Sequence, residues 1–383
     1  MDLSRFDHAA FLRDVWQQKP MLIRQPWTAW HNPLEPNALA GLACEEDVES
    51  RLIVGGLGNW SVEHGPVPEH RFAALGEKAW TLLVQAVNHH VPEVAALLEP
   101  FRFIPNWRID DVMVSYAADG GGVGPHFDRY DVFLVQGLGQ RRWRIGGRCD
   151  DATPLLPHDD LRLLADFEAS EEWVLEPGDV LYIPPGFAHD GVAVGSDCMT
   201  YSIGFRAPSR GELIEGWTDA VLGELSDDDR YTDAGLHTQP NPGEISSEAL
   251  AKLHAMVAER LLETEGFARW FGRYSSARKY PDVDWRPEKA ITAKALRRAL
   301  DQGAVLERNP ASRFAFVVQD SGAVLLFVDG ECYESSGVAA GFAQAICAQE
   351  RLAADAALAG CGDAVALIVQ LFNHGSLVFA EEV

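Results

Sequence analysis

Residues 107 to 205 constrain the fold more than any other part of the sequence, because short apolar runs there are separated by glycine, proline and aspartate. Several runs have the length and side chains of strands, namely 111 to 117, 131 to 136, 141 to 145, 172 to 175, 180 to 183 and 199 to 205. Short strands with turn signals between them are typical of a double-stranded β-helix, or jelly roll. The sequence therefore predicts a β barrel here.

The segments on both sides of this barrel have helical periodicity. Before it, residues 6 to 16 predict an entry helix, residues 21 to 23 a short strand, and residues 80 to 89 a helix with one apolar face. After it, two apolar stripes between 211 and 275 predict further helices. Such stripes need a cover, which is either the barrel or a second copy of the chain.

Residues 280 to 287, rich in proline and aspartate, predict a domain boundary. Beyond it come a helix at 292 to 302, a hairpin around Asp320 to Gly322 and two more helices, an arrangement that resembles a winged-helix module. This stretch lacks a dense basic surface, so protein docking or a structural role is favoured over nucleic-acid binding. We predict an α+β chain with domains at 1 to 209, 210 to 280 and 281 to 383.

Composition narrows the possible partners and location. The formal net charge of −25 argues against a phosphate backbone as the main ligand and leaves basic partners open, although charge alone favours a simple role in solubility. The six cysteines form no C-x-x-C pair, so neither a zinc knuckle nor a disulfide framework is indicated. The sequence starts without a basic and apolar leader and has no apolar run of bilayer length, which predicts a cytoplasmic protein without membrane contact.

His126 and Asp128 follow a glycine-rich run at 120 to 124 and lie two residues apart. On a strand, that spacing directs both side chains to one face. An imidazole and a carboxylate on one face are two ligands of the 2-His-1-carboxylate site, which binds Fe(II) and leaves other coordination positions open. An H-x-D pair alone is more often structural, so the interpretation depends on a third ligand.

The third ligand is offered by His189, which follows a buried strand bounded by two turns at 177 to 179 and 184 to 186. The proline and glycine residues of the second turn can direct His189 back into the barrel. A lone histidine is more often a bystander, but the combination with H-x-D reverses that expectation. We therefore predict a metal site formed by His126, Asp128 and His189.

Arg141 is the candidate for a neighbouring anion site. The sequence predicts a hairpin over 131 to 145 that turns at Gly137 to Gly139, and on its second strand Arg141, Trp143 and Ile145 share one face. A guanidinium on an apolar face needs an anionic partner, and its planar fork fits a carboxylate such as that of a 2-oxo diacid. If the faces are reversed, Arg141 instead forms a surface ion pair.

Together these motifs resemble the JmjC-type Fe(II)/2-oxoglutarate oxygenases, and among them the bacterial ribosomal oxygenases that hydroxylate arginine. The segments that carry the resemblance are 120 to 133, 139 to 146, 176 to 189 and 201 to 208, with further likeness at 11 to 20 and 80 to 89. The resemblance is strong through about residue 210 and looser towards the C-terminus.

The resemblance implies a JmjC barrel, a helical dimerisation segment and a C-terminal winged-helix-like domain. It implies that His126, Asp128 and His189 bind Fe(II), and that Arg141 and the hydroxyl of Ser115 bind 2-oxoglutarate. The implied reaction hydroxylates an arginine side chain of a large-subunit ribosomal protein, consumes O2 and 2-oxoglutarate, and releases succinate and CO2. The implied partners are this basic protein and a second copy of the chain.

The choice of substrate would come from the rim of the site, where Asp119, Tyr130 and Asp131 could hold a guanidinium. For Asp119, capping a turn is an equal alternative. The glycines at 120 to 124 are interpreted as the lip over which the substrate enters. Two other functions stay open: a JmjC oxygenase acting on another protein residue, including lysine demethylation, and a non-catalytic cupin-like binding module.

Overall fold

The computed structural model describes residues 3, 6 to 56, 59 to 77 and 79 to 380. Its internal contacts define two compact units, one made of Met1–Ala207, Lys279–Asp284 and Asn309–Ala311, the other of Pro208–Arg278, Trp285–Arg308 and Ser312–Val383. The predicted absence of a leader concerns a terminus that lies partly outside the described residues. The predicted boundaries at 209/210 and 280/281 stay predictions.

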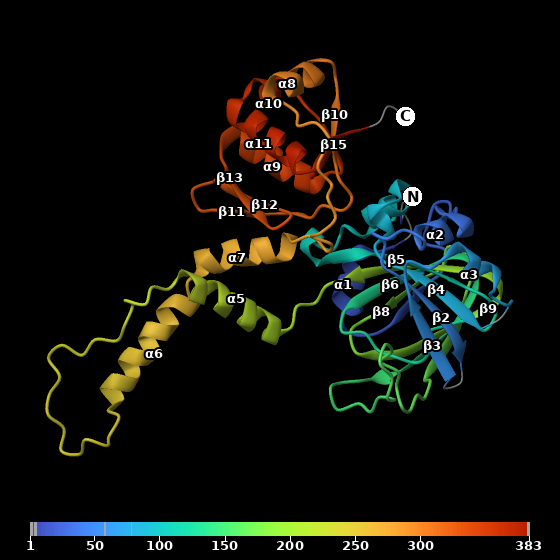
Figure 1. Cartoon of the computed structure of the whole chain (residues 1–383), viewed down its shortest axis with the longest axis horizontal. Coiled ribbons are helices and arrows are strands. Elements are labelled where there is room, and N and C mark those ends of the chain that lie inside the picture. Colours follow the sequence, from blue (N-terminus) through green and yellow to red (C-terminus); the bar gives the residue numbers. More distant parts are fainter. Residues whose placement is uncertain (1–2, 4–5, 57–58, 78, 381–383) are drawn as a thin grey trace. The chain divides into compact units, whose positions relative to one another are not determined.

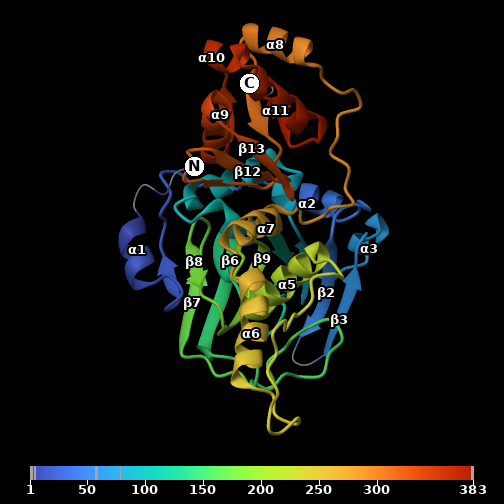
Figure 2. The same ribbon diagram turned by 90° about the vertical axis from the view of Figure 1, so that its left-hand side faces the viewer.

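The first unit is built on an antiparallel sheet, drawn in blue to green in Figures 1 and 2. Its described strands follow the order β1-β8-β6-β9-β5-β4-β2-β3, with β7 paired to β6. The strands are β1 Met21–Ile23, β2 Ser50–Gly56, β3 Asn59–His64, β4 Trp80–Val84, β5 Ile109–Ala117, β6 Asp131–Arg148, β7 Glu171–Leu175, β8 Val180–Ile183 and β9 Phe187–Phe205. The helices are α1 His8–Asp14, α2 Pro36–Leu42, α3 Glu69–Ala73 and α4 Pro92–Ala95, with short 3₁₀ helices at Val87–His89, Ala96–Phe101 and Asn106–Arg108.

The two faces of strand β5 show how this sheet separates a core from a site. Val112 and Val114 are fully buried in the large apolar core that also contains Phe133 of β6. Ser115 and Ala117, offset by one residue, lie on the opposite face because side chains alternate along a strand. The predicted β-rich region is confirmed, and Ser115 of β5, Arg141 of β6 and Cys198 of β9 lie on its second face.

The predicted hairpin at 131 to 145 is wrong, because β6 is one strand that pairs with β9 along its whole length. Gly137 and Gly139 lie at register shifts in this pairing and not in a turn. A Cβ atom at Gly137 would lie 2.5 Å from the ring of Tyr201, and one at Gly139 would lie 2.8 Å from the carbonyl oxygen of Asp197. These glycines permit close strand approach at a bulge, which has the same sequence signature as a turn.

The predicted helix at 80 to 89 is also wrong. Residues Trp80–Val84 form β4, which pairs with both β2 and β5, and a 3₁₀ turn follows at Val87–His89. Ala86 between them has a φ of 51°, which ends the extended conformation. Apolar residues buried on both faces of a central strand form a continuous run that periodicity alone cannot distinguish from a helix.

The second unit begins with three helices and continues into a winged-helix module (Figure 1). Ser209 caps the first helix by a capping box with Glu212, and Ser246 caps the second through the amide of Ala249. The helices are α5 Arg210–Glu224, α6 Ser247–Leu261, α7 Thr264–Ser276, α8 Ala293–Asp301, α9 Gly337–Ala348, α10 Ala356–Gly360 and α11 Gly362–Asn373. The strands are β10 Val305–Arg308, β11 Phe314–Val318, β12 Val324–Val328, β13 Glu331–Ser335, β14 Arg351–Ala353 and β15 Leu377–Phe379.

The predicted hairpin of this module is confirmed, since β11 and β12 pair antiparallel around the turn at 319 to 323. β13 extends it to a three-stranded sheet, and β10 pairs with β14 and β15 in a second small sheet. None of the helices in the described ranges has both the length and the apolarity that crossing a lipid bilayer requires.

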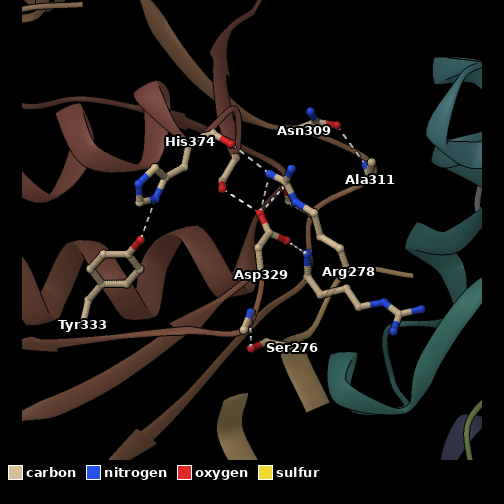
Figure 3. A network of polar contacts seen from close by, with 11 residues as sticks. Ser276, Arg278, Asn309, Ala311, Asp329, Tyr333 and His374 are labelled. Atoms are coloured by element: carbon tan, nitrogen blue, oxygen red, sulfur yellow. Dashed lines mark hydrogen bonds and ion pairs between the residues drawn. The ribbon is translucent and has the colours of Figure 1, made fainter. Parts of the chain in front are cut away.

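A polar network around Asp329 holds the end of α7 to the module (Figure 3). The carboxylate of Asp329 accepts hydrogen bonds from Arg278 at 2.8 Å, from the hydroxyls of Ser312 and Ser376 at 2.8 and 2.6 Å, and from the amide of Arg313 at 3.0 Å. Asp329 itself has a φ of 54°, a conformation that aspartate tolerates better than most residues. The network satisfies a nearly buried charge at the turn after β12.

Candidate metal centre

The structure brings His126, Asp128 and His189 together. Their potential ligand atoms all lie within 4.8 Å of one another, and Asp128 Oδ2 is 3.5 Å from His189 Nε2 and 4.0 Å from His126 Nε2. Two ligand atoms that bind one metal at right angles and about 2.1 Å are about 3 Å apart, so small side-chain rotations suffice. The three residues could therefore hold a metal ion.

The backbone fixes the positions of these side chains. The amide of His126 donates to the carbonyl of His189 at 3.0 Å, and the amide of His189 donates to the carbonyl of His126 at 2.8 Å. The amide of Gly186 also donates to the carbonyl of Asp128 at 2.7 Å. The turn at 184 to 186 thus places the start of β9 beside the H-x-D segment.

Both imidazoles are oriented for metal binding by their second nitrogen. Nδ1 of His126 lies 2.8 Å from the carbonyl oxygen of Gly124, and Nδ1 of His189 lies 2.9 Å from that of Phe187. A carbonyl only accepts, so each Nδ1 carries the proton and each Nε2 offers its lone pair to the site. Burial, reinforced by the neighbouring His126, lowers the pKa of His189 to about 4, so its ring is neutral at neutral pH.

The carboxylate ligand candidate has a tyrosine beside it. The phenol of Tyr130 lies close enough to Asp128 for the two groups to interact electrostatically. Burial of the phenol, followed by the charge of Asp128, raises the pKa of Tyr130 well above its usual value. The residue as a whole is 43% exposed, so its ring also forms part of the rim. Tyr130 can therefore orient the carboxylate and face an incoming substrate.

Backbone hydrogen bonds from β9 hold the glycine run before His126. Gly120 donates to the carbonyl of Ala193 at 3.0 Å, and the amide of Ala193 donates to Gly121 at 2.8 Å. A Cβ atom at Gly121 would lie 2.2 Å from the carbonyl of Trp80, and one at Gly122 would lie 2.6 Å from that of Gly191. The run needs glycine for close backbone approach. Its interpretation as a substrate lip has no support from this geometry.

Arg141 lies buried on the site face of β6, with 3% of its surface exposed. It pairs in register with Ala193 of β9, and its side chain lies beside Trp143 and Cys198. Among the described residues, Arg141 Nη2 and Trp143 Nε1 are buried donors that have no acceptor. Leaving such a donor unsatisfied costs about 1–3 kcal/mol, and more for a charged group. An anionic ligand with carboxylate oxygens would satisfy this arrangement.

The remaining predicted residues lie in different environments. Ser115 is buried beside this region, and its hydroxyl donates to the carbonyl of Thr200 at 3.4 Å. Asp119 is partly exposed, and its carboxylate accepts a hydrogen bond from the amide of Gly195 at 2.9 Å. This contact corresponds to the turn-capping role that the sequence left open as an alternative. Asp131 has no exposed surface and accepts hydrogen bonds from Tyr182 at 2.6 Å and Arg108 at 2.9 Å.

Asp131 therefore has a structural environment. Because it lies one residue out of phase with Val132, it faces the core shared with Tyr182 and not the site. Burial raises the pKa of Asp131, while the hydrogen bonds from Tyr182 and Gln17 oppose that shift. Sequence reasoning about the rim missed this because the face of Asp131 depends on the register of β6.

Comparisons with known proteins agree with this geometry. A model of the JmjC domain matches residues 96–213, and a model of the ROXA-like winged helix matches residues 245–378. The chain is 41% identical to ribosomal protein uL16 3-hydroxylase of Escherichia coli, over 85% of each chain. It is 35% identical to a probable ribosomal oxygenase of Haemophilus influenzae, over 83% of this chain and 78% of the relative.

Solved structures give the same result. The crystal structure of E. coli YcfD superposes with a TM-score of 0.89 and 37% identity, covering 98% of each chain. A structure of that ribosomal oxygenase with cobalt and 2-oxoglutarate has a TM-score of 0.86 and 36% identity, covering 98% of this chain and 99% of the other. Fold and site thus define an Fe(II)/2-oxoglutarate-dependent oxygenase of the JmjC class. Within that class, the chain belongs to the ribosomal oxygenase family.

The side chains present fit the groups that this class uses. Two neutral imidazoles and one carboxylate are a donor set suited to Fe(II), and the buried donors of Arg141 and Trp143 suit the carboxylate of 2-oxoglutarate. When bound, iron, 2-oxoglutarate and O2 supply the oxidising chemistry of C–H hydroxylation. The chain itself orients the two imidazoles through their Nδ1 hydrogen bonds, keeps His189 neutral and buries the side chain of Arg141.

Proposed function

We propose that this chain hydroxylates an arginine side chain of the large-subunit ribosomal protein uL16. In this proposal His126, Asp128 and His189 hold Fe(II), while Arg141 and Ser115 bind 2-oxoglutarate. The main support is the combination of this triad with 41% identity to the E. coli uL16 3-hydroxylase along 85% of the chain. A ribosomal substrate also leads us to expect a cytoplasmic location.

Arginine selectivity would come from the rim. Tyr130 offers a partly exposed ring next to Asp128, and an aromatic face attracts a guanidinium. Asp119, partly exposed near the turn of β9, would add a charge-assisted hydrogen bond. We leave Asp131 out of the proposed substrate contacts because its carboxylate is buried and hydrogen-bonded. The net charge of −25 would favour encounter with a basic ribosomal protein.

Mass spectrometry of ribosomal proteins from cells with and without this gene tests the proposal. We expect a uL16 peptide containing arginine to carry one additional oxygen atom only when the gene is present. Fragmentation of that peptide assigns the oxygen to a residue. A ribosome unchanged by deletion of the gene would contradict the substrate assignment. If a different residue were oxidised or demethylated, the assignment as an oxygenase would stand, and that residue would replace arginine as the proposed target.

We further infer that two copies of the chain associate through α5 and α6. Ile214 and Leu222 of α5 are 59% and 60% exposed, and Leu250 and Val257 of α6 are 55% and 58% exposed. On each helix these residues are spaced so that they form an apolar stripe, and large exposed stripes usually mark an interface. The cover would be the same surface of a second copy, related by twofold symmetry.

Light scattering during size-exclusion chromatography tests the dimer. The wild-type chain should elute at twice the monomer mass at micromolar concentration, and Val257→Glu should elute as a folded monomer because a charge would replace an apolar contact. Lys252→Gln, on the same helix and outside the stripe, is the matched control and should remain dimeric. A monomeric wild-type protein would refute the inference.

A further inference from the structure

Cys198 contacts the guanidinium of Arg141 within the site region. It is fully buried on β9, and its Sγ accepts a hydrogen bond from Arg141 Nε at 3.4 Å. Gln136, which is also fully buried, donates its Nε2 to the same sulfur at 3.5 Å. The sulfur is therefore the shared acceptor of two buried donors. Sequence patterns alone assign no role to this cysteine, since strand pairing is needed to place it beside Arg141.

A bulge in β9 brings the cysteine to this position. Leu138 of β6 pairs with Met199, whereas Gln140, two residues later, pairs with Val194. The intervening residues of β9, including Cys198, are thus an insertion against a short piece of β6, and such bulges re-aim side chains. Ala117 and Ala193, which form a small buried cluster with Cys198, carry no polar side-chain atom that could replace the sulfur as acceptor for Arg141.

The hydrogen bond decides which edge of the guanidinium is available. A guanidinium can bind a carboxylate through Nε and one Nη atom, or through its two Nη atoms. The Nε–H group of Arg141 already donates to the sulfur of Cys198. Its Nη2 group is buried and has no acceptor among the described residues. A carboxylate that approaches Arg141 is thereby directed to the Nη1–Nη2 edge. The fork is held in one orientation before the ligand arrives, which reduces the entropy lost on binding.

We propose that Cys198 is a positioning residue for 2-oxoglutarate: its sulfur holds Arg141 so that the two Nη groups receive the distal carboxylate. The inference rests on the proposed role of Arg141 and adds the residue that orients it. Gln136 completes the arrangement, because its amide oxygen accepts the hydroxyl of Thr200 at 3.1 Å, and its amide nitrogen donates to the carbonyl of Leu138 at 2.7 Å and to the sulfur at 3.5 Å. The affinity for 2-oxoglutarate should therefore depend on whether the side chain at position 198 can accept a hydrogen bond, and depend less on the volume of that side chain.

Three variants separate these properties. Cys198→Ala removes the acceptor, Cys198→Ser retains one, and Cys347→Ala is a control that truncates a buried cysteine in the winged-helix module. Titration of 2-oxoglutarate into Mn(II)-loaded protein by calorimetry measures binding without turnover. We expect Cys198→Ala to weaken binding about tenfold, the effect of losing one hydrogen bond to a charged group. Cys198→Ser and the control should stay within about twofold of wild type.

Kinetics provide a second readout. Cys198→Ala should raise the KM for 2-oxoglutarate and leave kcat nearly unchanged, since the bond is made equally before and during the reaction. Unchanged binding in Cys198→Ala, or equal weakening in the alanine and serine variants, would overturn the proposal. If the wild-type protein itself does not bind 2-oxoglutarate, the role of Arg141 fails, and with it this inference. Wild-type binding without any hydroxylation of uL16 would refute the proposed substrate alone.

Discussion

Replacing Asp128 by alanine should reduce hydroxylation of the substrate by more than about 100-fold. Residues that only orient metal ligands already contribute 10–100-fold to metal affinity or activity, so loss of the charged ligand candidate should exceed that range. Asp128 is the carboxylate of the group, and it lies 3.5 Å from His189 Nε2. Without it the site would keep two neutral imidazoles and no negative charge to balance a divalent cation.

The fold should survive this substitution. The hydrogen bonds that join His126 to His189, and Gly186 to residue 128, are all between backbone atoms and do not depend on the carboxylate. Product formation by mass spectrometry and metal content after dialysis against Fe(II) under anaerobic conditions provide the measurements. Asp151→Ala is the matched control, since this carboxylate on the nearby loop is 82% exposed. An Asp128→Ala protein that binds iron and turns over normally would exclude Asp128 as a ligand.

The grouping of the three candidate metal ligands was predictable because their sequence signals are local. His126 and Asp128 lie two residues apart and reach one site, although they belong to no strand and only an isolated bridge joins His126 to His189. The turn before His189 redirects the chain within a few residues. The position of Arg141 was predictable for a related reason. Side chains alternate along a strand, so Arg141 and Trp143 share one face whether β6 is half of a hairpin or a continuous strand.

The errors concern features that depend on distant partners. A bulge and a turn both require glycine, so Gly137 to Gly139 could not indicate a continuous β6 until its pairing with β9 was known. The glycines before His126 are interpreted as a substrate lip, which stays a prediction, whereas their need for close contact with Gly191 and Trp80 could not be foreseen from the sequence. Asp131 suggested a rim carboxylate, although its partners come from residues 17, 108 and 182. Tertiary contacts of this kind have no local signature.

Replacing Arg141 by methionine should have opposite effects on stability and function. In the ligand-free protein Arg141 Nη2 is a buried donor without an acceptor among the described residues, and the guanidinium is charged. Methionine of similar length removes this unsatisfied charge and fills much of the same volume. We therefore expect the free energy of unfolding to rise by about 1–3 kcal/mol in the absence of cosubstrate. Urea unfolding of both proteins measures the difference.

Addition of 2-oxoglutarate should reverse the order of stability. At a concentration of 100 times Kd, a ligand that binds only the folded state stabilises it by about 2.7 kcal/mol, and Arg141→Met should gain almost none of this because the carboxylate loses its anchor. Hydroxylation should fall in parallel. Arg142→Met is the control, since the neighbouring arginine is exposed on the other face of β6 and should change neither quantity. If Arg141→Met were destabilised without cosubstrate and still gained stability from it, Arg141 would be a structural cation, and the anion would bind elsewhere.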